Sequence, residues 1–517
     1  MAWSSDFVDR LNAGGTFDFV WALEVMVVGA APSAGTTILA SQEGIGNACC
    51  IGLRGVRVQG GRLSMQSWTS TVGAFTIDIV GDPSTMFEYI TRGSWVRVLC
   101  GFPGWTIDDY QPVAIGRVYT IRGAPPLWTI ECWDWKSALR SRNDPAHPAL
   151  FWSLGSTTVA AAFAANSDTS LTTTSTTDAR ESVGTGALRV AGPTADFYLT
   201  FTGTATGPIR YTGVSTANKF ATSQEAVSTE AVSNVAYLSG HPLDIVRKVL
   251  ASTGTASANG AYDKYPSGWG YAIPDAHIDH DDVDRWQGEV VTVSGTYTVE
   301  LHVDEAQEDG LSWLEGWMTP MGLFFAVRQG KITVRAVGGD LGEILFGDIA
   351  EITDADIEAG PSAPAIEWEC WDSDYSIEYQ AVRFTSTQHN GTGVTDTATA
   401  ADPATLPAGE VEDISLAESA WDNTYAVEVV AEVRDRLAIT HMRIPERLTL
   451  SLPLRFAQCT PGDGIYLSTT RVYGREESSS LAYESRLATI TEVSPDWMAG
   501  RCTVSLAIFP TTENAFG

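Results

Sequence analysis

The sequence predicts a β-dominated α+β fold with two related small β-barrels, an α+β middle block and an inserted Thr/Ser-rich β module. Three observations lead to this prediction. The 517-residue chain holds 48 Gly, 23 Pro and abundant Thr and Val, which favours strands joined by many turns. Three consecutive segments within 93–139 alternate as neighbouring strands do. The tetrapeptide Glu-Cys-Trp-Asp at 131–134 returns at 369–372, although Cys and Trp are rare here (7 and 17 residues), which suggests two related barrels.

Length and composition predict three or four domains, at about 150 residues each. The boundaries follow from a shift to Thr, Ser, Ala and Gly at Ser153 and from a Pro-rich stretch at 361–364. We expect a first β-barrel domain (1–152), an inserted Thr/Ser/Gly-rich β module (153–239), an α+β middle domain (240–362) and a second β-barrel domain with a helix (363–517).

The first domain is expected to consist of strands with one short helical segment. Strand candidates are 17–28, 48–58, 62–68, 73–82, 93–102, 112–121 and 126–139, with a helix-like segment at 83–93. In 93–102 large apolar residues lie on both faces, so we expect this strand to be covered on both sides. We interpret Trp95, Trp133 and Trp135 as core and ring-packing residues rather than as a ligand platform.

Two interpretations of residues 153–239 remain open. Their composition is typical of a flexible linker. Alternating segments at 186–192, 195–203 and 208–214, which carry aromatic residues, favour a small inserted β module.

The middle domain and the second barrel are predicted from helical and strand periodicity. The middle domain should hold helices at 241–253 and 304–321, a strand at 288–303, and a hairpin at 322–337 that turns at Gln329 and Gly330. For the second barrel we expect strands at 366–386, 447–456, 464–474, 486–493 and 501–509, a polar loop at 389–410, a helix at 425–442 and a tight turn at 461–463.

Charge and cysteine usage restrict the possible partners. The net charge of −31, with only five lysines, is opposite to the balance of a nucleic-acid-binding surface. The seven cysteines form no Cys-x-x-Cys motif, which favours buried reduced thiols and assembly in a reducing cytoplasm. No apolar run reaches the ~18 residues of a membrane span, and the N-terminal residues lack a secretory pattern.

The densest polar cluster is the stretch from His277 to Asp284, with two imidazoles and four carboxylates in eight residues. It could bind a divalent cation, but its spacing matches neither an EF-hand nor a zinc site, and a solvated acidic loop before Trp286 is the favoured interpretation. Acidic pairs such as Asp108-Asp109 and Glu476-Glu477 are weak candidates for a glycosidase. The aromatic residues of 262–271 could stack on sugars, but packing onto a barrel is favoured.

No catalytic, cofactor-binding or metal-binding residue is therefore assigned. The sequence contains no Gly-x-Ser-x-Gly, no phosphate-binding Gly-rich loop with Gly-Lys, and no His-Glu-x-x-His. We expect a protein that is not an enzyme and has no cofactor.

Several segments together resemble the phage tail hub family, the baseplate hub or tail-tip proteins of tailed phages and gene transfer agents. The resemblance is carried by 73–82, 93–102 and 114–121, by the helix and hairpin of 311–337, and by 447–456, 459–468 and 486–493. It covers most of the chain except 153–239, and the role of that insertion stays open.

The resemblance implies a structural virion protein at the tail tip or baseplate, assembled in the bacterial host cytoplasm. Family members form homotrimers, and their six barrels make a pseudo-sixfold ring between the hexameric tail tube and the threefold tip. The implied partners are a tail tube or distal tail protein above and tail-tip or fibre proteins below. An acidic ring would let DNA pass during ejection without binding it. The alternative is a receptor- or polysaccharide-binding adsorption protein of the tail tip.

Overall fold

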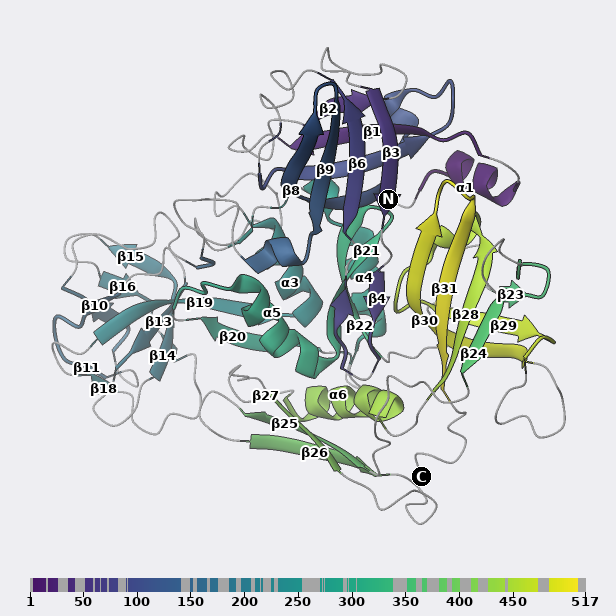
Figure 1. Ribbon diagram of the computed structural model, residues 1–517. Coiled ribbons are helices and arrows are strands. Elements are labelled where there is room, and N and C mark those ends of the chain that lie inside the picture. Colours follow the sequence, from purple (N-terminus) through teal and green to yellow (C-terminus); the bar gives the residue numbers. More distant parts are fainter. Residues whose placement is uncertain are drawn as a thin grey trace.

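The computed structural model describes the chain in stretches between residues 3 and 509. The larger gaps between these stretches are 27–35, 42–51, 82–89, 141–148, 175–185, 217–224, 253–269, 338–350, 370–380, 400–410, 417–425 and 473–482, and shorter gaps occur elsewhere. The fold is α+β and dominated by strands, as predicted. Figure 1 shows two sheets at the top and right, a central helical block, and an inserted module at the left.

A seven-stranded sheet within the first 134 residues forms the first barrel. In spatial order its strands are β2 (Thr36–Ser41), β1 (Val20–Met26), β7 (Trp95–Gly101), β8 (Gln111–Ala124), β9 (Leu127–Asp134), β6 (Phe75–Val80) and β3 (Gly52–Val58). The edge strands β2 and β3 contact each other, so the sheet closes on itself. Strand β7 is buried along nearly its whole length, which confirms the expectation that both of its faces are covered.

A second sheet, which we call the second barrel, is built mainly from the last third of the chain. Its strands are β23 (Glu351–Thr353), β29 (Gly464–Thr469), β30 (Tyr483–Asp496), β31 (Arg501–Ile508), β28 (Glu446–Pro453) and β24 (Ile366–Glu369), with β4 (Gly61–Leu63) and β5 (Ser70–Thr71) added beside β30. Strand β28 alternates strictly between buried and half-buried residues. Side chains from both β23 and β24 pack on one cluster, so the sheet wraps around a single core.

The two barrels have the same order of strands. Strands β7, β8 and β9 form a meander, β6 pairs with β9, and β3 pairs with β6. In the second barrel β29, β30 and β31 form the meander, β28 pairs with β31, and β24 pairs with β28. The sixth strand differs in direction, because β1 is antiparallel to β7 whereas β23 is parallel to β29. The common order supports the prediction of two related barrels.

The repeated tetrapeptide does not mark equivalent strands. Residues 131–134 end β9, which corresponds to β31. The second copy begins at Glu369, the last residue of β24, which corresponds to β3. Residues 370–372 lie outside the described stretches. The repeat therefore does not identify the equivalent strands, because Glu131 lies on β9 and Glu369 lies on β24, which do not correspond.

One strand predicted for the first domain belongs to the second sheet. The candidate at 62–68 contributes β4, whose residues Gly61 and Arg62 pair with Val493 and Glu492 of β30. Strand β5 in turn pairs with β4. The first part of the chain thus extends an arm onto the second barrel. The helix-like segment expected at 83–93 lies mostly outside the described residues.

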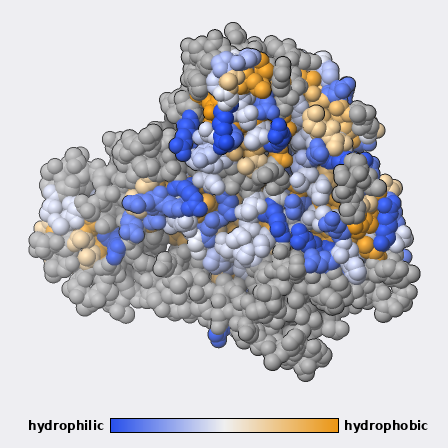
Figure 2. All heavy atoms as spheres, viewed as in Figure 1, coloured by the Kyte–Doolittle hydropathy of each residue, from blue (hydrophilic) through white to orange (hydrophobic). Residues whose placement is uncertain are grey.

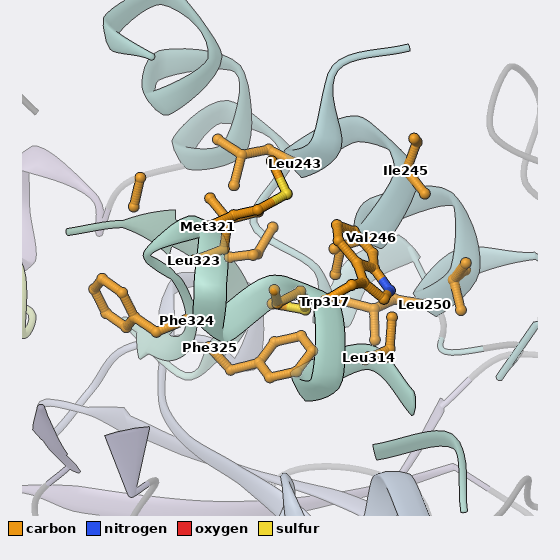
Figure 3. Packing of buried hydrophobic residues seen from close by; sticks show 14 of the residues in the cluster. Leu243, Ile245, Val246, Leu250, Leu314, Trp317, Met321, Leu323, Phe324 and Phe325 are labelled. Atoms are coloured by element: carbon orange, nitrogen blue, oxygen red, sulfur yellow. The ribbon is translucent and has the colours of Figure 1, made fainter. Parts of the chain in front are cut away.

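The middle block packs three helices against a hairpin. The helices are α3 (Pro242–Ala251), α4 (His280–Glu289) and α5 (Gly310–Met318), and the strands are β20 (Val299–Val303), β21 (Leu323–Arg328) and β22 (Lys331–Ala336). The hairpin turns at Gln329 and Gly330, as predicted, and both residues have positive φ (50° and 68°). Figure 3 shows Trp317 and Phe325 among aliphatic side chains of α3 and α5. Each such fully buried side chain contributes about 1.5–3 kcal/mol.

Helix α4 corrects two expectations for the middle domain. The acidic stretch before Trp286 was expected to be a solvated loop, and a strand was expected from residue 288. Instead Asp279 caps a helix, its carboxylate accepting a hydrogen bond from the Asp282 amide at 3.2 Å. Acidic residues in a first helical turn are favoured by the helix dipole, which explains why this stretch forms a helix. The described strand, β20, begins only at Val299.

The inserted module has its own apolar core. Its strands are β10 (Ser156–Thr158), β11 (Phe163–Ala164), β12 (Ser170–Thr172), β13 (Gly186–Val190), β14 (Phe197–Phe201), β15 (Gly203–Ala205), β16 (Arg210–Thr212), β17 (Ser215–Thr216), β18 (Glu225–Ala226) and β19 (Ala231–Gly240). Buried Leu188, Phe201 and Tyr211 form its cluster. Strand β19 continues out of the module and pairs with β20 in the middle block. The described part favours the β-module interpretation over a flexible linker.

The remaining elements lie around this framework. They are helices α1 (Ser5–Asn12) and α6 (Ala426–His441), strands β25 (Ala381–Thr387), β26 (Gly393–Thr399) and β27 (Val411–Leu416), and short 3-10 turns η1 (Ile107–Asp109), η2 (Ser137–Arg140), η4 (Asp275–His277), η5 (Thr319–Met321) and η7 (Leu454–Gln458). Helix α6 packs on β25 and β26 (Figure 1). The polar loop expected at 389–410 is wrong in part, because its β-branched residues form β26 against β25.

Candidate functional site

A buried ionic cluster joins the middle block to the second barrel. Arg335 of β22 donates from Nε and Nη2 to the two carboxylate oxygens of Asp282, at 2.8 and 3.0 Å. Its Nη1 donates to Asp463, in the turn before β29, at 3.0 Å. All three side chains are fully buried. Two segments that are far apart in the sequence are therefore held by one guanidinium group.

Two further arginines complete the charge balance of this cluster. Arg328 Nη1 donates to Asp279 at 3.1 Å, and Arg285 Nη2 donates to Asp282 at 2.9 Å. Burial raises the pKa of Asp282, but the guanidinium groups of the three arginines outweigh it and keep that pKa below its ordinary value. Three carboxylates thus face three arginines, which is the condition under which buried charges are tolerated.

The buried carboxylates of the stretch from His277 to Asp284 belong to this ionic cluster and so do not form a solvated loop. These two carboxylates bind arginines, and His277 is buried with neither ring nitrogen hydrogen-bonded in the described part of the chain. Burial, with Arg97 and Lys331 nearby, lowers the pKa of His277 to about 3, so the ring is neutral at pH 7. Among the described residues, no group of three or more His, Cys, Asp or Glu side chains is placed to hold a metal ion.

A cavity lies where the two barrels and the middle hairpin meet. It has an empty volume of about 740 Å³, part of which is open to solvent, and its walls include Ile115, Phe325 and Cys459. Three buried polar atoms that line it, Ser70 Oγ, Gln329 Nε2 and Trp497 Nε1, have no hydrogen-bond partner in the described structure. Buried polar groups of this kind are commonly satisfied by water, so the junction is a packed interface with a polar pocket.

The strand registers of the two barrels agree residue by residue. In the first barrel the β8–β9 register shifts after Val118, the eighth residue of β8. In the second barrel the β30–β31 register shifts after Ile490, the eighth residue of β30. The β7–β8 register shifts after the fourth residue of β7, and the β29–β30 register shifts after the fourth residue of β29. Because bulges re-aim strands at defined points, two bulges at matching positions make the two meanders equivalent in detail.

The bulge in β8 places an exposed tyrosine against a half-buried tryptophan. Tyr119 is the extra residue of that bulge, is 41% exposed, and stacks on Trp133 with ring centroids 4.8 Å apart. The Arg92 guanidinium lies 5.5 Å from the centroid of each ring. The structure thus corrects the interpretation of Trp133 as a core residue, whereas Trp95 and Trp135 are buried as expected. Sequence reasoning missed this surface group because the bulge is not visible in the alternation.

The other candidates from the sequence have structural roles or lie outside the described residues. Asp109 accepts hydrogen bonds from the Thr106 amide and hydroxyl at 3.0 and 2.7 Å and so caps a 3-10 turn. Residues 476–477 and most of 262–271 lie in undescribed stretches. Cys100, Cys132, Cys459 and Cys502 are buried free thiols, and burial raises their pKa values.

The described helices and the face seen in Figure 2 add little to these candidate sites. Within the described stretches, no helix is both long enough and apolar enough to cross a bilayer. Figure 2 shows hydrophilic and apolar residues mixed on the face in view, with apolar groups over both barrels.

Comparisons with known proteins give weak structural similarities. The chain is similar to a chain from the virion of a native gene transfer agent particle, with a TM-score of 0.30 and 16% identity over 71% of this chain and 79% of that chain. It is also similar to the 43 kDa tail protein of prophage MuSo2 from Shewanella oneidensis, with a TM-score of 0.35 and 8% identity over 95% of this chain and 98% of that chain. No protein-family model and no curated protein matches.

Proposed function

We propose that this protein is a structural virion component, the hub at the tail tip or baseplate of a phage-like tail. In this role it forms a homotrimeric ring that joins the hexameric tail tube, or a distal tail protein, to the threefold tip and its fibres. The observation that carries the proposal is the equivalence of the two barrels in strand order and in bulge position.

Three copies of a chain with two equivalent barrels present six equivalent units, which can match a sixfold partner on one side while the chain itself remains threefold. Closed rotational symmetry satisfies every such interface without open ends. The buried ionic cluster and the arm of β4 fix the second barrel relative to the rest of the chain, as a ring of alternating barrels requires.

Charge gives the ring a second property. A net charge of −31 on each chain makes a negative field around any enclosed channel. The phosphate backbone is repelled by such a field, so DNA would leave through the channel without binding to it. The role needs no catalytic residue, and we propose no enzymatic activity.

Native mass spectrometry and electron microscopy of the purified chain test this proposal. The expected result is a trimer whose averaged images show a ring with six similar lobes and true threefold symmetry. A monomer or dimer at micromolar concentration would contradict the hub.

A second candidate is a receptor- or polysaccharide-binding role for the inserted module. It is favoured by the position of that module, which projects away from both barrels (Figure 1) and has its own core. Glycan binding by the full chain that is lost when 156–226 is replaced by a short linker would support this role. Equal binding by both forms would exclude the module as the receptor-binding part.

A further inference from the structure

Besides the direction of the sixth strand, the two barrels differ at the outer half of the long meander strand. In the second barrel, β30 extends beyond its partner β29, and the free edge is filled by β4, with Gly61 and Arg62 opposite Val493 and Glu492. Strand β4 belongs to the first part of the same chain. The second barrel is therefore completed by strand β4, an arm from the part of the chain that forms the first barrel.

The matching edge of the first barrel is open in the described structure. Glu492 and Val493 are the tenth and eleventh residues of β30, and their counterparts in β8 are Thr120 and Ile121. On the β7 side, pairing of β8 ends at Val118, whose amide donates to Ser94 O at 3.0 Å. Beyond that point no described strand pairs with β8 on the side away from β9.

The residues around this edge are of the kinds that dominate protein interfaces. Tyr119, Trp133 and Arg92 form the exposed stack directly before the open edge. Tyr, Trp and Arg are the side chains most enriched at interface hot spots. The edge itself remains half-buried at Thr120 and Ile121 and becomes exposed from Arg122 to Ala124. An unpaired strand edge of this kind is a template for another strand.

We propose that this open edge, from Tyr119 to Ala124, receives a strand from the second barrel of a second copy of this chain. The arrangement repeats between copies what β4 does within one chain: each barrel completes the next. The proposal rests on the trimeric ring proposed above and adds its lateral interface. Donor and acceptor surfaces differ, so the contact is head-to-tail, and a head-to-tail contact closes into a ring when its rotation permits.

A photo-crosslinking experiment on the full chain tests this interface. One variant carries p-benzoylphenylalanine in place of Thr120, and the matched control carries it in place of the equivalent Glu492. The control is expected to crosslink within one chain, to the peptide that contains Gly61–Leu63, because β4 lies beside that position. The Thr120 variant is expected to give covalent dimers and trimers, with the linked peptide in the range 363–517.

The outcomes separate this inference from the proposed function. A trimer by mass in which the Thr120 variant crosslinks only within its own chain, or to the first barrel of another copy, would overturn the interface and leave the hub intact. A monomer by mass would overturn both.

A second measurement uses the exposed stack. Replacing Tyr119 by Ser is expected to weaken trimer association at least tenfold, the range of an interface hot spot, with little change in thermal stability because the side chain is 41% exposed. The control is Met498→Ser, at the tip of the β30–β31 hairpin with 84% exposure, which is expected to leave association unchanged. Equal association of wild type and Tyr119→Ser would exclude the stack from the interface.

Discussion

Arg335 offers the sharpest test of how the chain is held together. Replacing it by Ala removes four hydrogen bonds: two to Asp282, one to Asp463 and one to the Pro461 carbonyl. Both carboxylates would stay fully buried with less compensation. Breaking a buried pair in this way costs about 3–5 kcal/mol, because a charge is left without its partner.

The expected effect can be measured by thermal or urea unfolding of the full chain. For a cooperative unit of 150–250 residues, each kcal/mol lowers the melting temperature by about 2–4 °C, so the first transition should fall by roughly 6–20 °C. The comparison variant is Arg57→Ala, which removes the surface ion pair with Asp78, where the arginine side chain is 81% exposed. Such a pair contributes about 0–1 kcal/mol.

An Arg335→Ala variant whose first transition falls no further than that of Arg57→Ala would refute a stabilising role of the buried cluster. Arg335→Lys discriminates further. It keeps the positive charge but lacks the planar fork that binds both oxygens of Asp282 and also reaches Asp463, so its transition should lie between those of Arg335→Ala and wild type.

Three other predictions follow from particular residues. His277 binds a proton near pH 6.5 when unfolded but only near pH 3 when folded, so it contributes stability that is lost as pH falls from about 6.5. His277→Leu should therefore flatten the loss of unfolding free energy between pH 6.5 and 4 by up to about 1.4 kcal/mol per pH unit in urea titrations, and an unchanged slope would contradict this. Gly330→Ala should destabilise the chain by more than about 1 kcal/mol, since φ is +68° and the new Cβ would lie 2.7 Å from the Pro112 carbonyl carbon, whereas Gly316→Ala in helix α5 meets no atom within 4 Å and should be neutral or stabilising. In an electrophoretic assay at about 50 mM salt, duplex DNA should not be retarded, and retardation that weakens with added salt would show phosphate contacts that the acidic ring excludes.

Local patterns were sufficient for much of the fold. The hairpin at 322–337 and the helix near 241–253 are encoded by neighbouring residues, and both were found within a few residues of the predicted bounds. The acidic stretch from His277 to Asp284 failed for a different reason. Arg328 and Arg335, which bind its buried carboxylates Asp279 and Asp282, lie 49 and 53 residues away in the chain, and the local sequence does not identify them.

The similarity of the two barrels was predicted from a repeated tetrapeptide that does not mark equivalent strands. Sequence identity at two tetrapeptides pointed to it, but their first residues, Glu131 and Glu369, lie on strands that do not correspond. The real signal was geometric: strands of 14 and 8 residues in each meander, with bulges at the same steps. Bulges depend on pairing across a sheet rather than on residue type, so unrelated side chains such as Tyr119 and Thr491 occupy the same bulge position.

Strand β19 places a limit on how this chain can change. Its first half pairs with β10 and β13 in the inserted module, and its second half pairs with β20. Val232 enters the core of the module and Leu238 enters the central core, six residues apart and hence on one face of the strand. One added residue between them would turn one of these side chains out to solvent. Loops of the module can therefore vary in length, whereas the number of residues in β19 between Val232 and Leu238 must stay constant. The pairing of β19 with β20 keeps the module in a fixed orientation on the middle block.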